Sequence, residues 1–285
     1  MAEPIRLGLV QLDAERLDAA AARERATEAA ASALAAGADL VVLPELAVPG
    51  YLGDAEALAA GAESLGGPTV TGWQQLVAGT GKVVVGGFCE RAGEGVYNAV
   101  AVVSDAGVIG HYRKLHLFGG ERKLFLPGDR GLPVVDTPLG RVGICVCYDL
   151  RFVEVTRILA LQGAQVVAVP TAWVPGFDAE WWGPDGLCPQ ARSAGVLANL
   201  NQVFVACASF AGAREDLTFL GSSVVFGPHG DLRTGPLPGA GAATTIATVD
   251  LDDTAAALAR GGTLASPRAD RRTDVYTLGY AGREW

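Results

Sequence analysis

The segment VGICVCYDLRF, residues 142–152, runs from a predicted strand into a predicted helix and places a thiol at the junction. Its apolar first half predicts a buried strand over 141–146, and the apolar spacing over 152–161 predicts a helix. A second buried strand is predicted over 165–169. This order is typical of layered α/β proteins, in which strand ends hold the reactive groups, so Cys147 is a candidate nucleophile.

The rest of the chain continues this alternation. Helices are expected over 19–36, 70–78 and 190–199, and strands over 6–11, 39–43, 82–88, 97–104, 203–208, 221–226 and 243–249. We find no repeat, low-complexity block or linker, so we expect one domain over residues 1–285. A tail from about 251 to 285 has few helix or strand signals and is expected to pack on the domain or on a neighbouring subunit.

Composition excludes several classes of protein. Half of the 285 residues are hydrophobic and 19% are charged, which is enough apolar material for a large core. The net charge of −9 argues against nucleic acid as a partner. The N-terminus does not look like a signal peptide, and no long apolar run suggests a membrane span. Five cysteines, an odd number, fit free thiols in the cytoplasm better than a disulfide framework.

Cys147 also has a purely structural interpretation. Most free cysteines are buried small hydrophobic residues, and residues 142–152 alone do not decide between that role and a nucleophile. Cys145, inside the apolar run, is expected to pack in the core. No metal site is predicted, because the three histidines (111, 116 and 229) are scattered and no second cysteine pair occurs. If Cys147 reacts, backbone N–H groups at the turn can bind a developing oxyanion.

Two further strand ends carry charged groups. VVLPELAVPGY, residues 41–51, places Glu45, and HYRKLHLFGGERKLFLPGD, residues 111–129, places Lys114. A carboxylate that emerges from a buried strand is costly to desolvate without a partner, so Glu45 is the predicted base. Lys114 is expected to hold a negative oxygen and to favour a thiolate. The alternatives are a strand-end salt bridge for Glu45, and His116 as the base, although His116 could simply position its loop.

The three segments resemble the carbon–nitrogen hydrolase (nitrilase) superfamily, whose Glu-Lys-Cys triad is similar to Glu45, Lys114 and Cys147. GLVQLD near the N-terminus, PGD at 127–129 and RRTDVY near the C-terminus also occur in the expected order. The resemblance implies a four-layer α-β-β-α sandwich. It also implies homodimers or larger homo-oligomers, formed through helical faces and the tail.

Several residues bear on the branch of the superfamily. CYDLRF looks like the amidase-type branches, and Glu121 lies where amidases and carbamoylases have a second glutamate that orients the substrate or the attacking water. A solvated loop acid is the alternative for Glu121. Leu150 replaces an arginine of N-carbamoyl-D-amino-acid hydrolases, which makes a carbamoyl amino acid less expected. LANLN, residues 197–201, replaces a frequent Arg-Ala-x-Glu-Asn, so the helix packing should differ there because an ion pair is absent.

The resemblance implies an amidohydrolase that cleaves a small carboxamide to a carboxylic acid and ammonia through a thioester on Cys147. The Tyr148 backbone N–H is expected in the oxyanion site, and no metal or organic cofactor is expected. Tyr51 and Trp173 are predicted to line the substrate pocket, whereas the roles of Trp181 and Trp182 stay open. The alternatives are an N-carbamoyl amine hydrolase, a nitrilase and a catalytically silent member.

Overall fold

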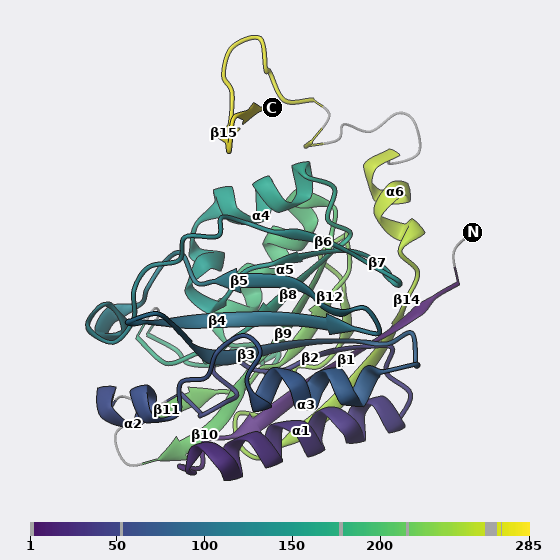
Figure 1. Ribbon diagram of the computed structural model, residues 1–285. Helices are drawn as coiled ribbons and strands as arrows, with labels where there is room; N and C mark the ends of the chain where they lie inside the picture. The colour runs from purple at the N-terminus through teal and green to yellow at the C-terminus, as the bar shows by residue number, and fades with distance from the viewer. Residues whose placement is uncertain (1–2, 52–53, 177–178, 215–216, 260–266, 269) are drawn as a thin grey trace.

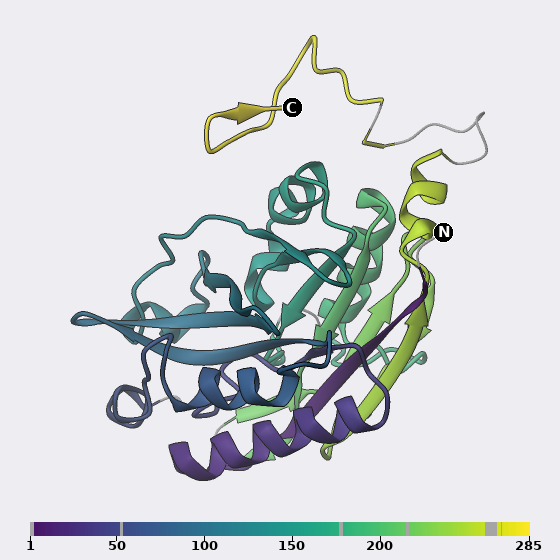
Figure 2. The same ribbon diagram turned by 45° about the vertical axis from the view of Figure 1, so that its right-hand side comes forward.

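Two β-sheets lie face to face, and helices cover the outer face of each. The structure is a computed structural model that describes residues 3–51, 54–176, 179–214, 217–259, 267–268 and 270–285. Figures 1 and 2 show the layers from two directions, with α1 and α3 outside one sheet and α4 and α5 outside the other. This is the four-layer α-β-β-α sandwich that the resemblance implies.

The first sheet has eight strands within the described residues, in the order β11-β10-β1-β2-β3-β4-β5, with β14 paired to β1. β1, β2 and β3 are parallel, and β3, β4 and β5 are antiparallel. The strands are β1 (Ile5–Asp13), β2 (Leu40–Val42), β3 (Val83–Ala92), β4 (Gly95–Ser104), β5 (Gly107–Arg113), β10 (Phe210–Arg214), β11 (Leu217–Leu220) and β14 (Ala243–Val249). Its helices are α1 (Ala19–Ala35), α2 (Ala55–Ala60) and α3 (Pro68–Val77).

The second sheet has six strands in the part of the chain described, in the order β13-β12-β9-β8-β7-β6. β7, β8 and β9 are parallel, which leaves their carboxyl ends at one edge. The strands are β6 (Val134–Thr137), β7 (Gly140–Ile144), β8 (Val166–Pro170), β9 (Phe204–Ala208), β12 (Val224–Phe226) and β13 (Leu232–Thr234). Its helices are α4 (Val153–Leu161) and α5 (Pro189–Asn201).

Apolar residues on both faces of the strands explain why the layers stack. Successive side chains of a strand point to opposite faces. In β2, Leu40 and Val42 pack in the core between the sheets, whereas Val41 packs in the core under α1 and α3. Strands that are buried on both faces read as continuous apolar runs and not as alternating ones.

The chain changes sheets at a point that the sequence pattern conceals. Residues 203–213 are almost entirely apolar and predict one strand over 203–208, yet the chain leaves the second sheet after β9 and enters the first as β10. Ser209, fully buried between them, donates its backbone N–H to the Ser223 hydroxyl. The hairpin of β10 and β11 was therefore missed, as were the short strands β6 and β13 and the short helix α2.

The expectation that the tail has little secondary structure is wrong at its start. Helix α6 (Asp252–Ala259) has two aspartates in its first turn and an alanine-rich body, both of which favour a helix. Residues 260–266 and 269 lie outside the described residues. Beyond them, a hairpin forms from β15 (Gly279–Tyr280) and β16 (Arg283–Glu284), and Leu278, Tyr280 and Trp285 pack against the core. No helix in the described ranges is long and apolar enough to cross a membrane.

Candidate active site

Three charged side chains form one buried cluster. Lys114 Nζ donates hydrogen bonds to Glu45 Oε1 at 2.6 Å and to both carboxylate oxygens of Glu121 at 2.8 Å. Glu45 is fully buried, and Lys114 and Glu121 are nearly so. Such a cluster is costly to desolvate and is held only with good geometry. The sequence predicted that Glu45 and Lys114 would meet, and the structure brings Glu121 to the same ammonium.

A tight turn behind β2 places Glu45. Leu46 has a φ of +48°, in the left-handed region, and the turn lies against Gly87 of β3. A Cβ on Gly87 would lie 2.4 Å from Pro44 O and 2.9 Å from Glu45 Cα, so only glycine lets the turn approach the sheet this closely. From β4, Asn98 Nδ2 donates to Glu45 Oε1 at 2.7 Å.

Backbone hydrogen bonds hold Lys114 from both sides, directly after β5. Its N–H donates to Asn98 O at 2.8 Å, and its C=O accepts from Gly128 N at 2.9 Å. Gly128 belongs to the PGD motif, and a Cβ there would lie 2.0 Å from Arg113 O. Arg113 is itself anchored by Glu90 at 2.7 and 2.8 Å. The glycine and the arginine of these motifs thus fix the backbone that carries the lysine.

Cys147 lies where β7 gives way to the 3-10 helix η2 (Cys147–Arg151). Its φ is +45°, a left-handed conformation that costs a residue with a side chain about 1–2 kcal/mol. Asp149 stabilises this turn, because its Oδ2 accepts from Val146 N at 2.8 Å and from Tyr112 Oη at 2.7 Å. The strained turn directs the thiol out of the strand and into a cavity.

His116 positions a loop. Its backbone N and its Nδ1 lie 3.1 and 2.7 Å from Asp149 Oδ1, and its ring stacks on Phe152 with 3.6 Å between the centroids. It does not belong to the described residues that line the cavity at Cys147. His116 therefore connects the loop after Lys114 to the turn of Cys147. These contacts fit the alternative in which His116 positions its loop.

The electrostatics of the site keep the thiol protonated. Burial raises the pKa of Glu45 to about 7, against the lowering effect of the Lys114 charge. Burial and the Glu45 carboxylate raise the pKa of the Cys147 thiol well above its ordinary value, which Lys114 only partly offsets. Lys114 thus acts on the thiol in the expected direction, towards the thiolate, but burial and the Glu45 carboxylate outweigh it. Glu45 Oε2 has no hydrogen-bond partner among the described residues, so this oxygen is free to accept a proton.

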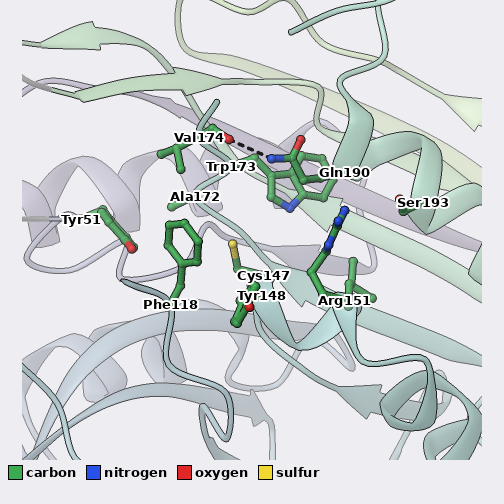
Figure 3. Close-up of a pocket in the computed structure, with 11 residues that line it drawn as sticks. Tyr51, Phe118, Cys147, Tyr148, Arg151, Ala172, Trp173, Val174, Gln190 and Ser193 are labelled. Carbon is green, nitrogen blue, oxygen red and sulfur yellow. Dashed lines mark hydrogen bonds between the residues drawn. The ribbon is translucent and has the colours of Figure 1, made fainter. Parts of the chain in front are cut away.

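A small cavity opens at the thiol (Figure 3). Its volume is about 20 Å³, roughly the room that one or two water molecules need. Phe118 and Tyr51 lie on one side of the thiol in this view, and Arg151 lies on the other. The walls are mostly apolar and consist of Tyr51, Phe118, Cys147, Tyr148, Leu150, Arg151, Ala172, Trp173, Val174, Gln190 and Ser193.

Both predicted pocket residues lie on this wall. Tyr51 Oη donates to Glu121 Oε1 at 2.6 Å, so the ring connects the wall to the charged cluster. Trp173 follows β8 and is almost fully buried. Trp181 and Trp182 are outside the described lining of this cavity, and their rings pack edge to face at 5.9 Å. Tyr148, predicted for the oxyanion site through its backbone, adjoins the thiol in the first turn of η2.

The cysteines and the acidic side chains are also possible metal ligands. In the ranges described, no group of three or more His, Cys, Asp or Glu side chains could hold a metal ion. All five cysteines are free, and Cys145 is fully buried in the core between the sheets, as expected.

Comparison with known proteins identifies the family. Residues 6–258 match the family described as carbon-nitrogen hydrolase. This chain belongs to the carbon–nitrogen hydrolase family. The hydrolase is 32% identical to a protein named nitrilase from Pyrococcus abyssi, over 80% of this chain and 83% of that one. It is 35% identical to an (R)-stereoselective amidase from a Pseudomonas species, over 79% of this chain and 78% of the relative.

Solved structures of an amidase from Nesterenkonia sp. AN1 have the same fold as this hydrolase. In one of them, a mutant, acrylamide has undergone Michael addition at the active-site cysteine. The TM-score is 0.73 and the sequence identity 26%, with 95% of this chain and 98% of that chain covered. The architecture seen here is thus that of a nitrilase-superfamily amidase.

The sequence did not single out several residues that complete the site of this hydrolase. Asp149 and Asn98 are buried polar side chains next to the proposed catalytic groups, and Phe118 and Gln190 belong to the cavity wall. Asn98 had a signal, because it is a polar residue inside the apolar strand at 97–104. Asp149 had the same signal as Glu45, a carboxylate directly behind a buried strand. Phe118 and Gln190 had none, because loops and helices far apart in sequence bring them together.

Proposed function

We propose that this carbon–nitrogen hydrolase is an amidase that converts small carboxamides with a compact, apolar acyl group into carboxylic acids and ammonia. One observation carries the proposal: Tyr51 lines the small apolar cavity at the Cys147 thiol and donates to Glu121, which belongs to the buried cluster with Lys114 and Glu45. A thiol, a base and an ammonium in one site are the groups that acyl transfer through a thioester requires.

In the first half-reaction, Cys147 Sγ attacks the amide carbonyl carbon while its proton passes to Glu45 Oε2. The new S–C bond pushes the carbonyl electron pair onto oxygen. Lys114 donates twice to Glu121, so one N–H can turn to the oxyanion and one stay on the carboxylate, with the Tyr148 N–H as second donor. The tetrahedral intermediate then expels ammonia, which takes the proton from Glu45, and a thioester remains.

In the second half-reaction, water attacks the thioester carbonyl carbon. Glu45 accepts a proton from this water, and Glu121 holds the water in line through the oxygens that face Lys114 and Tyr51. Collapse of the second tetrahedral intermediate breaks the C–S bond. The carboxylic acid leaves, and the sulfur regains its proton from Glu45.

A second candidate substrate class is the N-carbamoyl amines. The polar side chains of Arg151, Gln190 and Ser193 at the cavity wall favour it, because they could bind a polar substituent. The two reactions differ in their products, since a carbamoyl substrate releases carbon dioxide together with ammonia.

The proposal is tested by product analysis on a panel of substrates. We would measure ammonia and carbon dioxide released by the full chain from aliphatic and aromatic carboxamides, N-carbamoyl amines and nitriles. Ammonia without carbon dioxide, from small aliphatic amides above all, is the expected result. Carbon dioxide release would favour the carbamoyl route, and turnover of nitriles alone would contradict the amidase assignment. No turnover of any compound, with Cys147 unreactive to alkylation, would indicate a catalytically silent member.

We further propose that a second copy of this chain covers the face made by α4, α5 and the tail. Val153, Val196 and Leu200 are 61%, 57% and 43% exposed on this face, and Tyr276 of the tail is 54% exposed. Leu200 belongs to the LANLN segment, which differs from the family pattern. Arg157 donates to the Leu200 carbonyl, and within the described residues it has no ion pair with an acidic side chain. Apolar side chains gathered on one face support a homodimer or a larger homo-oligomer. The free cysteines support a reducing compartment, the cytoplasm.

A further inference from the structure

We propose that Asn98 is a positioning residue that directs the thiol proton to one chosen oxygen of Glu45. The inference rests on the proposed function, in which Glu45 is the base. Asn98 is buried in β4 and is not among the described residues that line the cavity at Cys147.

One residue contacts two of the proposed catalytic groups through different atoms. The Asn98 side-chain Nδ2 donates to Glu45 Oε1 at 2.7 Å, and its backbone C=O accepts from Lys114 N at 2.8 Å. Glu45 and Lys114 come from loops 69 residues apart. Strand β4 therefore sets the position of the carboxylate and of the lysine backbone relative to the same rigid element.

The hydrogen bonds make the two oxygens of Glu45 unequal. Oε1 accepts from Lys114 Nζ and from Asn98 Nδ2, whereas Oε2 has no partner in the described part of the chain. An oxygen that already accepts two hydrogen bonds is the poorer base, so the proton goes to Oε2. The terminal torsion of glutamate has a broad energy minimum, and Lys114 alone would let the carboxylate turn. Asn98 is the second fixed donor that prevents this.

The amide of Asn98 has a fixed orientation for an electrostatic reason. A flip would place Oδ1 against Glu45 Oε1, two acceptors facing each other. In the observed orientation Oδ1 has no partner among the described residues. A buried amide with an unmet acceptor costs stability, and the strand continues after Asn98 with the core residues Ala99, Val100 and Ala101. An apolar residue would satisfy the fold better, so the bond to Glu45 is what the asparagine provides.

The test replaces Asn98 with leucine, which has a similar volume and no donor. Asn98→Leu is expected to lower kcat/KM at pH 7 by about 10- to 100-fold, the size of one hydrogen bond to a charged group, mostly in kcat. The acidic limb of the pH profile should move to higher pH, because the Asn98 hydrogen bond lowers the pKa of Glu45. A loss of activity with an unmoved limb would reduce Asn98 to a structural residue and overturn the proposal.

Asn201→Leu is the matched control. Asn201 is a buried asparagine of α5 whose Nδ2 donates to Leu197 O, and it has no contact with the charged cluster in the described structure. Its replacement should lower the unfolding midpoint in urea and leave the pH profile unchanged. If Asn98→Leu does not fold, Asn98→Asp keeps the shape and places a second carboxylate next to Glu45. That variant should move the acidic limb further upward, and an unmoved limb would again overturn the proposal.

A second readout separates this inference from the amidase assignment. The rate at which iodoacetamide alkylates Cys147, followed by peptide mass spectrometry from pH 5 to 9, needs no substrate. If no carboxamide is turned over, the rate should still rise as Glu45 ionises, and at a higher pH in Asn98→Leu than in the wild type. Identical profiles in the two proteins would refute the role of Asn98, whatever the substrate is.

Discussion

At the scale of single residues, the site combines a protonated thiol with a carboxylate that titrates near neutrality. A cysteine paired with a histidine or at a helix N-terminus is commonly held as a thiolate. Here the nearest bases are carboxylates, and a negative sulfur next to Glu45 in a buried site is unfavourable. If the thiol proton passes to Glu45 during the attack, a thiolate and a Glu45 carboxylate are never present together. The ammonium of Lys114 remains available for the oxyanion.

The pH dependence of activity follows from Glu45. Its pKa is raised to about 7, so below this pH the carboxylate is neutral and cannot accept the thiol proton. We expect kcat/KM to rise with pH along a limb centred near 7, and Glu45→Gln to lower activity by about 10²- to 10⁴-fold. The profile would be measured from pH 5 to 9 on a small carboxamide. A flat profile from pH 5 to 8 would contradict the assignment of the base.

Glu121 offers a second prediction for a single residue. It accepts hydrogen bonds from Lys114 Nζ, Tyr51 Oη and Phe118 N. The alternative interpretation, a loop acid, would instead require Glu121 to be exposed to solvent. Glu121→Gln keeps the size of the side chain and removes the charge. We expect a folded protein with kcat/KM lowered by about 100-fold. Tyr51→Phe removes only one donor and should lose less. Unchanged kinetics in Glu121→Gln would show that its position is structural.

At the scale of elements, strand ends from both sheets create the site. β2 and β5 of the first sheet deliver Glu45 and Lys114, and β7 and β8 of the second deliver Cys147 and Trp173. Because the two sheets pack face to face, the ends of these four strands lie close together. Small residues at the points of closest approach make this packing possible.

Gly87 tests this dependence on packing. A Cβ there would meet the backbone of the Glu45 turn at 2.4 Å, and backbone cannot move aside as a flexible side chain does. We expect Gly87→Ala to lower the free energy of unfolding by about 1–3 kcal/mol and to reduce kcat strongly, because the carboxylate shifts. Urea unfolding and kinetics would measure both effects. Gly66→Ala, where a Cβ meets nothing within 4 Å, is the control and should change neither.

The sequence predicted the elements that have strong apolar runs, because burial on both faces leaves an unambiguous pattern. It also placed Glu45, Lys114 and Cys147 at strand ends. It could not show that residues 203–213 divide between two sheets, since the pattern is apolar on both sides of Ser209. Nor could it predict the raised pKa of the thiol, which depends on how closely a carboxylate and apolar walls surround Cys147 in three dimensions.

At the scale of the whole molecule, the apolar face of α4 and α5 predicts self-association. We expect sedimentation equilibrium at micromolar concentrations to show a dimer or a larger oligomer. Leu200→Lys, on this face, should shift the equilibrium towards the monomer. Leu232→Lys, at a residue that is 48% exposed on β13, is the matched control and should not. A wild-type monomer at these concentrations would refute the proposed assembly.

The role of Cys147 is tested by ammonia release from the best small carboxamide by the wild type, Cys147→Ala and Cys145→Ala. We expect steady release by the wild type and none above background from Cys147→Ala. Cys145→Ala should keep most of the activity and lose about 1 kcal/mol of stability, because its thiol only packs in the core. Full activity in Cys147→Ala, or its loss in a folded Cys145→Ala protein, would contradict the assignment of the nucleophile.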